Sequence, residues 1–311
     1  MLRHLLESNN FTKNETELLL MVAENISKYP EKYRELAKYK RLATLFYESS
    51  TRTRISFETA MQKLGGDVIG FPSAEVSSAS KGESVEDTIR VIQCYADIVA
   101  MRHPKEGTAR LASEYSGIPI INAGDGSNEH PSQTMLDLYT IKQRLGRLDN
   151  FVIGFCGDLK YGRTVHSLTQ ILNKYYSGIE FYFISPEELK MPDRFLEKSM
   201  KYSEVNNLET TIDKLDILYM TRIQQERFSS KEEYMRFNGV YVLDENKMKR
   251  AKNSMAVMHP FPRVNEITLE VDKDPRAAYF DQVQNGLYIR MALIMALLGI
   301  KDPISGQLIL N

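Results

Sequence analysis

Short apolar segments recur along the chain, and most of them are followed by a polar loop and then by a helix-like pattern. Several segments, such as FVIGF at 151–155, contain no polar side chain, which is typical of strands covered on both faces of a sheet. Strands that alternate with helices predict βαβ units and parallel sheets. The predicted strands are 42–47, 97–101, 118–122, 151–155, 180–184, 216–220 and 256–259.

Two long helical patterns suggest how the chain is divided. The first follows Pro131, has apolar residues at spacings of three or four from Met135 onward, and is expected to end at Gly146. The second, at about 285–298, is apolar on most of its faces. With 311 residues the chain is long enough for two domains, each with its own core. We therefore expect an α/β fold of two doubly wound parallel-sheet domains joined by two long helices, with one domain at 1–134 plus 285–311 and the other at 135–284.

Composition excludes several classes of protein. The 40 Lys and Arg residues balance 41 Asp and Glu residues, so the basic excess of a nucleic-acid-binding surface is missing. No apolar run reaches the ~18 residues that span a bilayer, and the first ten residues are too polar for a secretory signal, so we expect a cytoplasmic protein. Cys94 and Cys156 belong to no Cys/His cluster, which argues against a disulfide framework and a zinc site.

The loops after the predicted strands are cationic. In open α/β sheets, ligands bind at the carboxyl ends of the strands. The corresponding loops are 48–54, 102–104, 123–133, 157–163, 221–227 and 259–263. Four of the five histidines and many arginines lie in or beside these loops, although the net charge is only −1. The expected ligand is therefore small and carries several negative charges.

The loop after the first predicted strand has the residues of an anion site. Ser50 and Thr51 are good N-cap residues for the helical pattern that follows, and Arg52, Thr53 and Arg54 come directly after them. Free N–H groups and the dipole at a helix start favour an anion, and arginine forks suit phosphate oxygens. The alternative is a capped helix with solvated arginines. The pattern of a Walker phosphate-binding loop is absent.

A second helix start holds His130 and Gln133 on either side of Pro131 and Ser132. A neutral imidazole there could donate a hydrogen bond to a carbonyl oxygen that gains charge during a reaction. The alternative, that His130 only caps the helix, is equally compatible with the local sequence.

Gly154, Gly157 and Gly162 follow or end another predicted strand. Their spacing is not that of GxGxxG, and no acidic residue ends the next strand, so a nicotinamide site is disfavoured. Arg163, at the start of the next helix, suits a carboxylate better. Taken singly, each of the remaining histidines of these loops is more typical of a structural role. A single arginine in such a loop is likewise more typical of a surface charge than of a ligand contact.

In combination, these stretches resemble the aspartate/ornithine carbamoyltransferase family, and TRIQ with HPFPR resembles the catalytic chains of its aspartate branch. The matching stretches are 50–54, 101–104, 130–133, 157–164, 221–224 and 259–263, in order along the chain. The resemblance implies transfer of a carbamoyl group from carbamoyl phosphate to L-aspartate, giving N-carbamoyl-L-aspartate and phosphate, an early step of pyrimidine biosynthesis. It implies no metal and no organic cofactor.

The resemblance also implies roles for individual residues. Carbamoyl phosphate would contact Ser50, Thr51, Arg52, Thr53, Arg102, His130, Gln133, Phe261 and Pro262. Among these, Thr53, Arg102 and His130 would polarise the carbamoyl oxygen, while Gln133 and the backbone of Phe261 and Pro262 would hold the carbamoyl amide. Aspartate would contact Lys81, Arg163, Arg222 and Gln224.

Lys81 lies in a small-residue stretch at 72–84 that is expected to form a long mobile loop. The resemblance implies that it acts catalytically in the site of a neighbouring subunit, within a homotrimer whose active sites are shared. It leaves open a separate regulatory chain, and it implies no nucleic-acid or membrane partner.

Three alternative functions fit the sequence less well than this interpretation. An ornithine carbamoyltransferase would typically carry a cysteine in the loop at 259–263, and Arg222 would repel the ornithine amine. A catalytically silent subunit would be expected to lose some of the key cations, yet all are present. A nicotinamide enzyme is disfavoured by the glycine spacing. One departure from the family pattern is Phe261, where leucine is usual.

Overall fold

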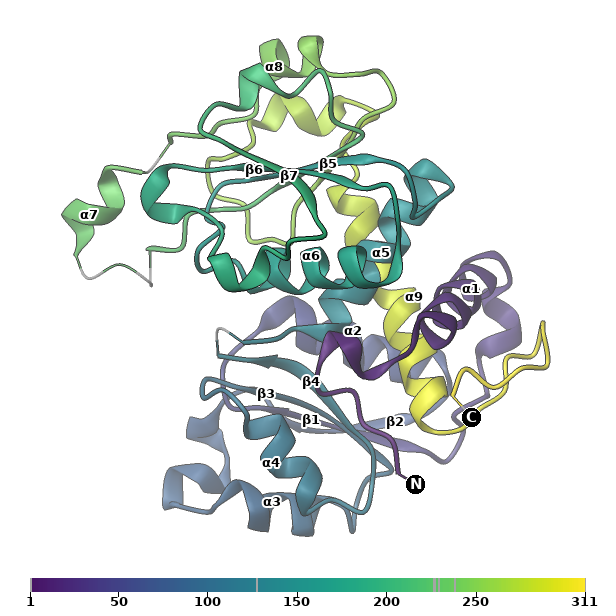
Figure 1. Ribbon diagram of the computed structural model, residues 1–311. Helices are drawn as coiled ribbons and strands as arrows, with labels where there is room; N and C mark the ends of the chain where they lie inside the picture. Colours follow the sequence, from purple (N-terminus) through teal and green to yellow (C-terminus); the bar gives the residue numbers. More distant parts are fainter. Residues whose placement is uncertain (1, 127, 226–227, 229, 238, 311) are drawn as a thin grey trace. The chain divides into compact units, whose positions relative to one another are not determined.

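The computed structural model describes residues 2–126, 128–225, 228, 230–237 and 239–310 (Figure 1). It divides the chain into two units: unit 1 is Met1–Tyr139 with Gln284–Asn311, and unit 2 is Thr140–Val283. Each unit contains one sheet, and every ladder between its strands is parallel. The two doubly wound parallel sheets expected from the alternating pattern are thus confirmed.

Helices alternate with strands over much of the chain. They are α1 (Lys13–Lys28), α2 (Thr51–Lys63), α3 (Val85–Ile92), α4 (Thr108–Glu114), α5 (Pro131–Leu145), α6 (Arg163–Tyr175), α7 (Lys231–Met235), α8 (Glu245–Arg250) and α9 (Tyr279–Leu297). The unit boundaries fall within α5 and α9, so both long helices pass from one unit into the other.

The sheet of unit 1 has the order β2-β1-β3-β4. Its strands are β1 (Arg41–Phe46), β2 (Asp67–Phe71), β3 (Ile98–His103) and β4 (Ile120–Asp125). On one face, Leu45 and Met101 pack with Ile89 of α3 and Ala112 of α4. On the other face, Thr44 donates a hydrogen bond to Glu58 of α2 at 3.0 Å. Helices therefore cover both faces, and Figure 1 shows α3 and α4 together on one of them.

The register of unit 1 brings three loops to one edge of the sheet. Phe46 of β1 pairs with Arg102 of β3, and His103 of β3 pairs with Asp125 of β4. Because neighbouring parallel strands end at the same edge, the residues after β1, β3 and β4 lie near one another.

The sheet of unit 2 has the order β7-β6-β5-β8-β9. Its strands are β5 (Val152–Cys156), β6 (Glu180–Ile184), β7 (Lys201–Val205), β8 (Ile217–Met220) and β9 (Ala256–Met258). Cys156 of β5 pairs with Met220 of β8, and Tyr219 pairs with Met258 of β9, so the loops after these three strands also share an edge. Figure 1 shows α6 and α8 on opposite faces of this sheet.

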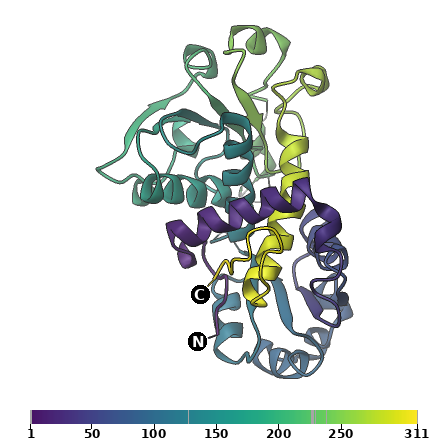
Figure 2. The ribbon, with the colours of Figure 1, turned by 90° about the vertical axis from the view of Figure 1, so that its right-hand side faces the viewer.

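The C-terminal segment is tied to the first helix. Asn25 of α1 donates a hydrogen bond to Asp302 at 3.0 Å, and the Tyr33 hydroxyl donates to the same carboxylate. Figure 2 shows α1 crossing the yellow C-terminal segment of unit 1. Asp302 is completely buried, so these bonds satisfy a charge that would otherwise be costly to bury.

The helix predicted after Pro131 is confirmed as α5, with Met135, Leu138 and Ile141 buried. Gly146 ends it in the left-handed region, at φ 71°, and its N–H donates to the carbonyl of Lys142.

Two strands and part of a helix were absent from the sequence prediction. The missed strands, β2 and β7, lie at sheet edges, where half-exposed residues leave no continuous apolar run. Helix α9 begins at Tyr279, six residues before the predicted start. The stretch at 72–84, expected to be a long mobile loop, contains two short 3-10 helices, Ala74–Val76 and Ser78–Lys81.

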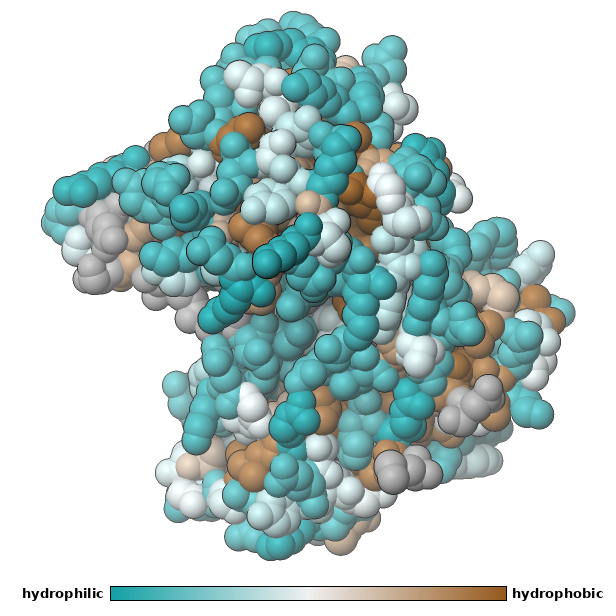
Figure 3. Space-filling view, viewed as in Figure 1, coloured by the Kyte–Doolittle hydropathy of each residue, from teal (hydrophilic) through white to brown (hydrophobic). Residues whose placement is uncertain are grey.

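The surface face in Figure 3 is mostly hydrophilic, with apolar side chains scattered over it. In the described part of the chain, no helix combines the length and the apolar character needed to cross a bilayer.

Candidate active site

The first turn of α2 carries the anion-binding sequence of unit 1. Ser50 is the N-cap residue, and its side chain makes no capping hydrogen bond. Thr51 and Arg52 are exposed, whereas Thr53 is buried. Arg54 forms an ion pair with Glu58 one turn later, at 3.0 Å. The first N–H groups of a helix lack partners within the helix, so this turn offers donors to an anion.

Arg102, at the end of β3, is a largely buried cation. Its Nη2 atom lies 2.9 Å from Oε2 of Glu48, a residue that follows β1. Burial lowers the pKa of Arg102, and the charge of Glu48 acts in the opposite direction. The buried Nε atom of Arg102 has no hydrogen-bond partner among the described residues. A desolvated guanidinium with an unused donor is suited to an anionic ligand.

His130 and Gln133 lie at the start of α5 and are almost completely buried. Nδ1 of His130 lies 3.4 Å from the Ser132 hydroxyl, and Nε2 of Gln133 donates to Oδ1 of Asp137 at 2.9 Å. The structure thus places His130 and Gln133 at the edge of the sheet that also carries Ser50–Thr53 and Arg102.

A buried carboxylate holds the loop before His130. Asp125 accepts the side-chain amide of Asn122 at 2.9 Å and the N–H of Glu129 at 3.1 Å. It also accepts the N–H of Gly107 at 2.9 Å, which ties the loop after β4 to the loop after β3. The loop therefore has a fixed framework; Ser127, within the predicted stretch 123–133, lies outside the described residues.

In unit 2, Asp158 connects the loops after β5 and β8. Its completely buried carboxylate accepts the N–H of Tyr161 at 3.0 Å and the N–H of Gln224 at 3.4 Å. Burial raises the pKa of Asp158, although these hydrogen bonds and the charge of Arg222 act in the opposite direction. Arg163 begins α6 at the end of the first loop. Asp158 thereby connects, through hydrogen bonds, the loop that leads to Arg163 and the loop that carries Arg222.

Gly157 makes this approach of the two loops possible. It has φ 126°, and a Cβ atom there would lie 2.2 Å from the carbonyl oxygen of Thr221. The glycine is therefore explained by close backbone packing between the two strand ends, without a dinucleotide.

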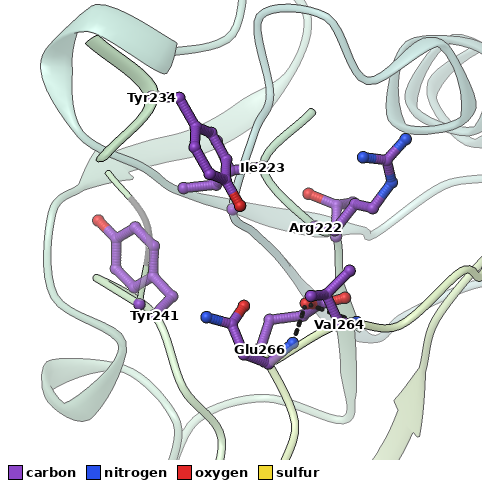
Figure 4. A pocket seen from close by; sticks show the side chains of 10 residues that line it. Arg222, Ile223, Tyr234, Tyr241, Val264 and Glu266 are labelled. Atoms are coloured by element: carbon purple, nitrogen blue, oxygen red, sulfur yellow. Dashed lines mark hydrogen bonds between the residues drawn. The ribbon is translucent and has the colours of Figure 1, made fainter. Parts of the chain in front are cut away.

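A pocket opens beside these loops. It is lined by Gly157, Thr221, Arg222, Ile223, Tyr234, Gly239, Tyr241, Val264, Asn265 and Glu266. Figure 4 shows Tyr234 and Tyr241 on one side and Arg222 and Val264 on the other, with the guanidinium pointing away from the tyrosines. Gln224 is half-buried in the same loop as Arg222, whereas Glu226 and Arg227 of the predicted stretch 221–227 lie outside the described residues.

His259 organises the loop after β9. Its Nε2 atom lies 2.6 Å from Oε1 of Glu266, and its Nδ1 atom accepts the N–H of Phe261 at 2.8 Å. The second contact requires an unprotonated Nδ1, so His259 is a neutral donor to Glu266. Burial lowers the pKa of His259, in agreement with that tautomer. The other oxygen of Glu266 accepts the N–H of Val264 at 3.2 Å and that of Asn265 at 3.0 Å.

Phe261 has a left-handed backbone, with φ 54°, which is uncommon for an aromatic residue. Its ring lies 6.0 Å from that of Tyr279 and 5.7 Å from that of Phe280, measured between centroids. Pro262 is exposed. The aromatic side chain thus packs within unit 2, so the backbone of the loop, and not the ring, is available to contact a ligand.

The other loop histidines have structural partners. Nε2 of His166 lies 2.7 Å from the carbonyl of Leu159, and burial lowers the pKa of His166 to about 4. Nδ1 of His103 accepts the N–H of Lys105 at 3.0 Å.

Lys81 is exposed at the end of its 3-10 helix. Among the described residues, no group of three His, Cys, Asp or Glu could hold a metal ion.

The sequence interpretation missed the carboxylates behind the cations. Those carboxylates are Glu48, Asp137, Asp158 and Glu266, whereas the prediction rested on the positively charged residues at the strand ends. A local signal exists for Glu48, which directly follows the predicted strand 42–47, and for Asp158, the third residue after the predicted strand 151–155.

Comparisons with known proteins agree with this geometry. Residues 3–143 match the family model described as "Aspartate/ornithine carbamoyltransferase, carbamoyl-P binding domain", and residues 149–297 match the corresponding "Asp/Orn binding domain". Aspartate carbamoyltransferase catalytic subunits of Lachnoclostridium phytofermentans and Clostridium kluyveri are 56% and 54% identical, over 96% of this chain and 99% of each relative.

Solved structures show the same fold. The catalytic subunit of M. jannaschii aspartate transcarbamoylase has a TM-score of 0.88 at 48% identity and covers 95% of this chain and 98% of its own. Aspartate transcarbamoylase from Trypanosoma cruzi, in complex with carbamoyl phosphate and aspartate, has a TM-score of 0.88 at 36% identity, over 94% of this chain and 95% of its own.

Proposed function

The chain belongs to the aspartate/ornithine carbamoyltransferase family, and we propose that it transfers the carbamoyl group of carbamoyl phosphate to the amine of L-aspartate. The products are N-carbamoyl-L-aspartate and phosphate, as in an early step of pyrimidine biosynthesis. Catalytic subunits that are 54–56% identical over nearly the whole chain support the aspartate reaction. The observation that carries the proposal is the row of cations at the strand ends of each unit, because both substrates are anions.

Unit 1 is proposed to bind carbamoyl phosphate and unit 2 to bind aspartate, with the domains at 1–134 plus 285–311 and at 135–284. Ser50, Thr51, Arg52 and Thr53 would hold the phosphate at the start of α2, where N–H donors and the helix dipole favour an anion. Arg102 would contribute its guanidinium, exchanging the carboxylate of Glu48 for the phosphate. The buried charge of Arg102 would thus be compensated by Glu48 in the empty site and by the phosphate in the loaded site.

The reaction is an attack of the aspartate amine on the carbamoyl carbon. The carbon–nitrogen bond forms, the carbonyl oxygen becomes an oxyanion, and the carbon–oxygen bond to phosphate then breaks. Thr53, Arg102 and His130 are proposed to donate hydrogen bonds to that oxygen, which stabilises the developing charge. The amine proton is proposed to pass to the departing phosphate, so the steps balance without a covalent enzyme intermediate.

The carbamoyl amide needs acceptors, because its NH2 group only donates. Oε1 of Gln133 and the backbone carbonyls of Phe261 and Pro262 are proposed to accept these hydrogen bonds. The His259–Glu266 pair holds the Phe261 backbone in place and so supports this role.

Arg163 and Arg222 are proposed to bind the two carboxylates of aspartate, with Gln224 in support. Asp158 holds their loops and is itself buried, so its charge is directed at backbone N–H groups instead of the substrate. Arg222 also gives a reason for the choice of substrate, since its charge attracts the aspartate side chain and would repel the amine of ornithine.

Lys81 is proposed to act in the site of a neighbouring subunit within a homotrimer, which its exposure on a short 3-10 helix permits. Mixing inactive Lys81→Gln trimers with inactive Arg102→Ala trimers under exchange conditions should restore activity, because one site in the hybrid would be intact. No recovery in confirmed hybrids would contradict sharing. A regulatory chain and a cytoplasmic location stay predictions.

Phosphate release from carbamoyl phosphate, measured with L-aspartate and separately with L-ornithine, tests the proposed reaction. Release with aspartate alone is expected. Release with ornithine alone would overturn the role of Arg222, and no release with either would favour a catalytically silent subunit.

A further inference from the structure

Arg290 is a completely enclosed cation that the proposed reaction does not use. It lies on α9, is 4% exposed, and donates from Nη1 to the Ser56 hydroxyl of α2 at 3.1 Å. Its guanidinium carbon is 5.1 Å from the centre of the Phe57 ring. Gly286 leaves room for it, since a Cβ atom there would lie 2.5 Å from Nη1. Such a costly buried charge calls for an explanation.

The compensating anion is Asp137 on α5, which is 0% exposed. Burial lowers the pKa of Arg290 to about 10, and the charge of Asp137 acts against that shift. Arg290 therefore remains charged at neutral pH and attracts the Asp137 carboxylate.

An ionised carboxylate can only accept hydrogen bonds, and Asp137 accepts one from Nε2 of Gln133 at 2.9 Å. The side-chain amide of Gln133 consequently has its NH2 group toward Asp137. Its Oε1 atom, on the opposite branch of the amide, is then an acceptor for a ligand. A protonated or neutral partner at position 137 could donate instead and would permit the amide to turn over.

We propose that Asp137 and Arg290 are positioning residues that fix the orientation of the Gln133 amide and thereby select a carbamoyl group over an acyl group. This inference rests on the proposed function. A carbamoyl NH2 donates to Gln133 Oε1, whereas the methyl group of an acetyl phosphate has no proton to donate. The discrimination is set inside unit 1, on α5 and α9, by two buried residues that do not touch the substrate.

The test compares three ligands that share a phosphate group: carbamoyl phosphate, acetyl phosphate and inorganic phosphate. Their Kd values are measured by titration calorimetry for the wild type and for Asp137→Asn. Loss of one hydrogen bond corresponds to about a tenfold change. We expect carbamoyl phosphate to bind about tenfold more weakly to the variant, with the Kd values of acetyl phosphate and inorganic phosphate unchanged. Equal weakening of all three ligands would show a merely structural role and overturn the proposal.

A double-mutant cycle separates action through Gln133 from direct effects. Gln133→Ala should weaken carbamoyl phosphate binding, and adding Asp137→Asn to it should cause no further loss. Additive losses would contradict positioning through Gln133. The proposed function is judged independently, by whether the wild type forms carbamoyl aspartate at all.

Two further variants guard against misfolding. Replacing the whole pair, in Asp137→Leu/Arg290→Met, removes both buried charges and is compatible with folding, because apolar residues can replace a buried ion pair. It should lose the same discrimination as Asp137→Asn. Asp302→Asn is the matched control, since Asp302 is equally buried in unit 1 but is bonded to Tyr33 and Asn25. It should lower Tm without changing the ratio of the three Kd values; a changed ratio would contradict the assignment.

Discussion

Replacing Asp158 by asparagine should separate the positioning of the aspartate-binding loops from the stability of the fold. The carboxylate receives the N–H groups of Tyr161 at 3.0 Å and Gln224 at 3.4 Å on its two oxygens. An asparagine keeps the shape and one acceptor, but it turns an NH2 group against one of the two N–H groups. The loops that carry Arg163 and Arg222 would then no longer be held in fixed positions relative to each other.

The magnitude follows from the two hydrogen bonds. A hydrogen bond to a charged group contributes about 1.5–3 kcal/mol, and the 3.4 Å contact is at the limit of the useful range. One lost bond with a residual clash gives about 2–3 kcal/mol, or a loss of about 30- to 150-fold in kcat/KM for aspartate. Binding of carbamoyl phosphate should change little, because Asp158 lies in unit 2.

The stability of the fold should change much less than kcat/KM. Burial raises the pKa of Asp158, so its folded form binds a proton more readily than the unfolded chain. The stability of the wild type therefore falls as pH rises from the unfolded pKa through the folded pKa, and the ionised group is a cost at neutral pH. We expect Tm of Asp158→Asn at neutral pH to stay close to that of the wild type, because removal of the buried charge offsets the lost hydrogen bond.

The assay is initial-rate kinetics in aspartate at saturating carbamoyl phosphate, with thermal unfolding of the same samples. Asp216→Asn is a suitable control, because Asp216 precedes β8, at the far end from the site, and accepts the N–H of Val152 at 2.9 Å. A kcat/KM for Asp158→Asn within threefold of the wild type would refute the reasoning, as would equal losses in the control.

Three further predictions concern the remaining contacts. Glu48→Gln removes the anion that pairs with Arg102, so inorganic phosphate should bind about fivefold more tightly, a modest gain because the Glu48 side chain is 42% exposed; weaker binding in calorimetry would contradict the exchange. His130→Ala and Arg102→Ala should each lower kcat by about 10²–10³ with near-wild-type circular dichroism, as expected for a lost oxyanion donor; normal turnover in either would remove that residue from its role. Glu266→Gln should lower the free energy of unfolding by about 1–3 kcal/mol, seen as a lower Tm, and should weaken carbamoyl phosphate binding, because His259 loses its charged acceptor. An unchanged Tm would show that this bond contributes little.

The sequence was most informative where a strand is covered on both faces. Strands β5 and β8 were predicted to within one residue, because helices on both sides of the sheet require apolar side chains throughout. The edge strands β2 and β7 each have one free edge and exposed residues, so their composition resembles that of a loop. The start of α9 was missed for a related reason, since Phe280 and Val283 are exposed apolar residues outside the helical stripe.

The candidate site was predictable as far as its residues are local. Ser50–Thr53, His130 and Gln133 begin helices, and a helix start is visible in the sequence. The carboxylates behind them were harder to infer, because some of their partners are distant in the chain. Asp158 accepts a hydrogen bond from Gln224, 66 positions away, and Glu48 pairs with Arg102 of another strand.

The formation of N-carbamoyl-L-aspartate from carbon-13-labelled carbamoyl phosphate, followed by NMR, tests the proposed reaction at the level of the product. With L-aspartate present, we expect one labelled carbamoyl aspartate for each phosphate released, and none with L-ornithine. Label recovered in a carbamoylated ornithine, or phosphate released without a labelled aspartate product, would contradict the proposed reaction.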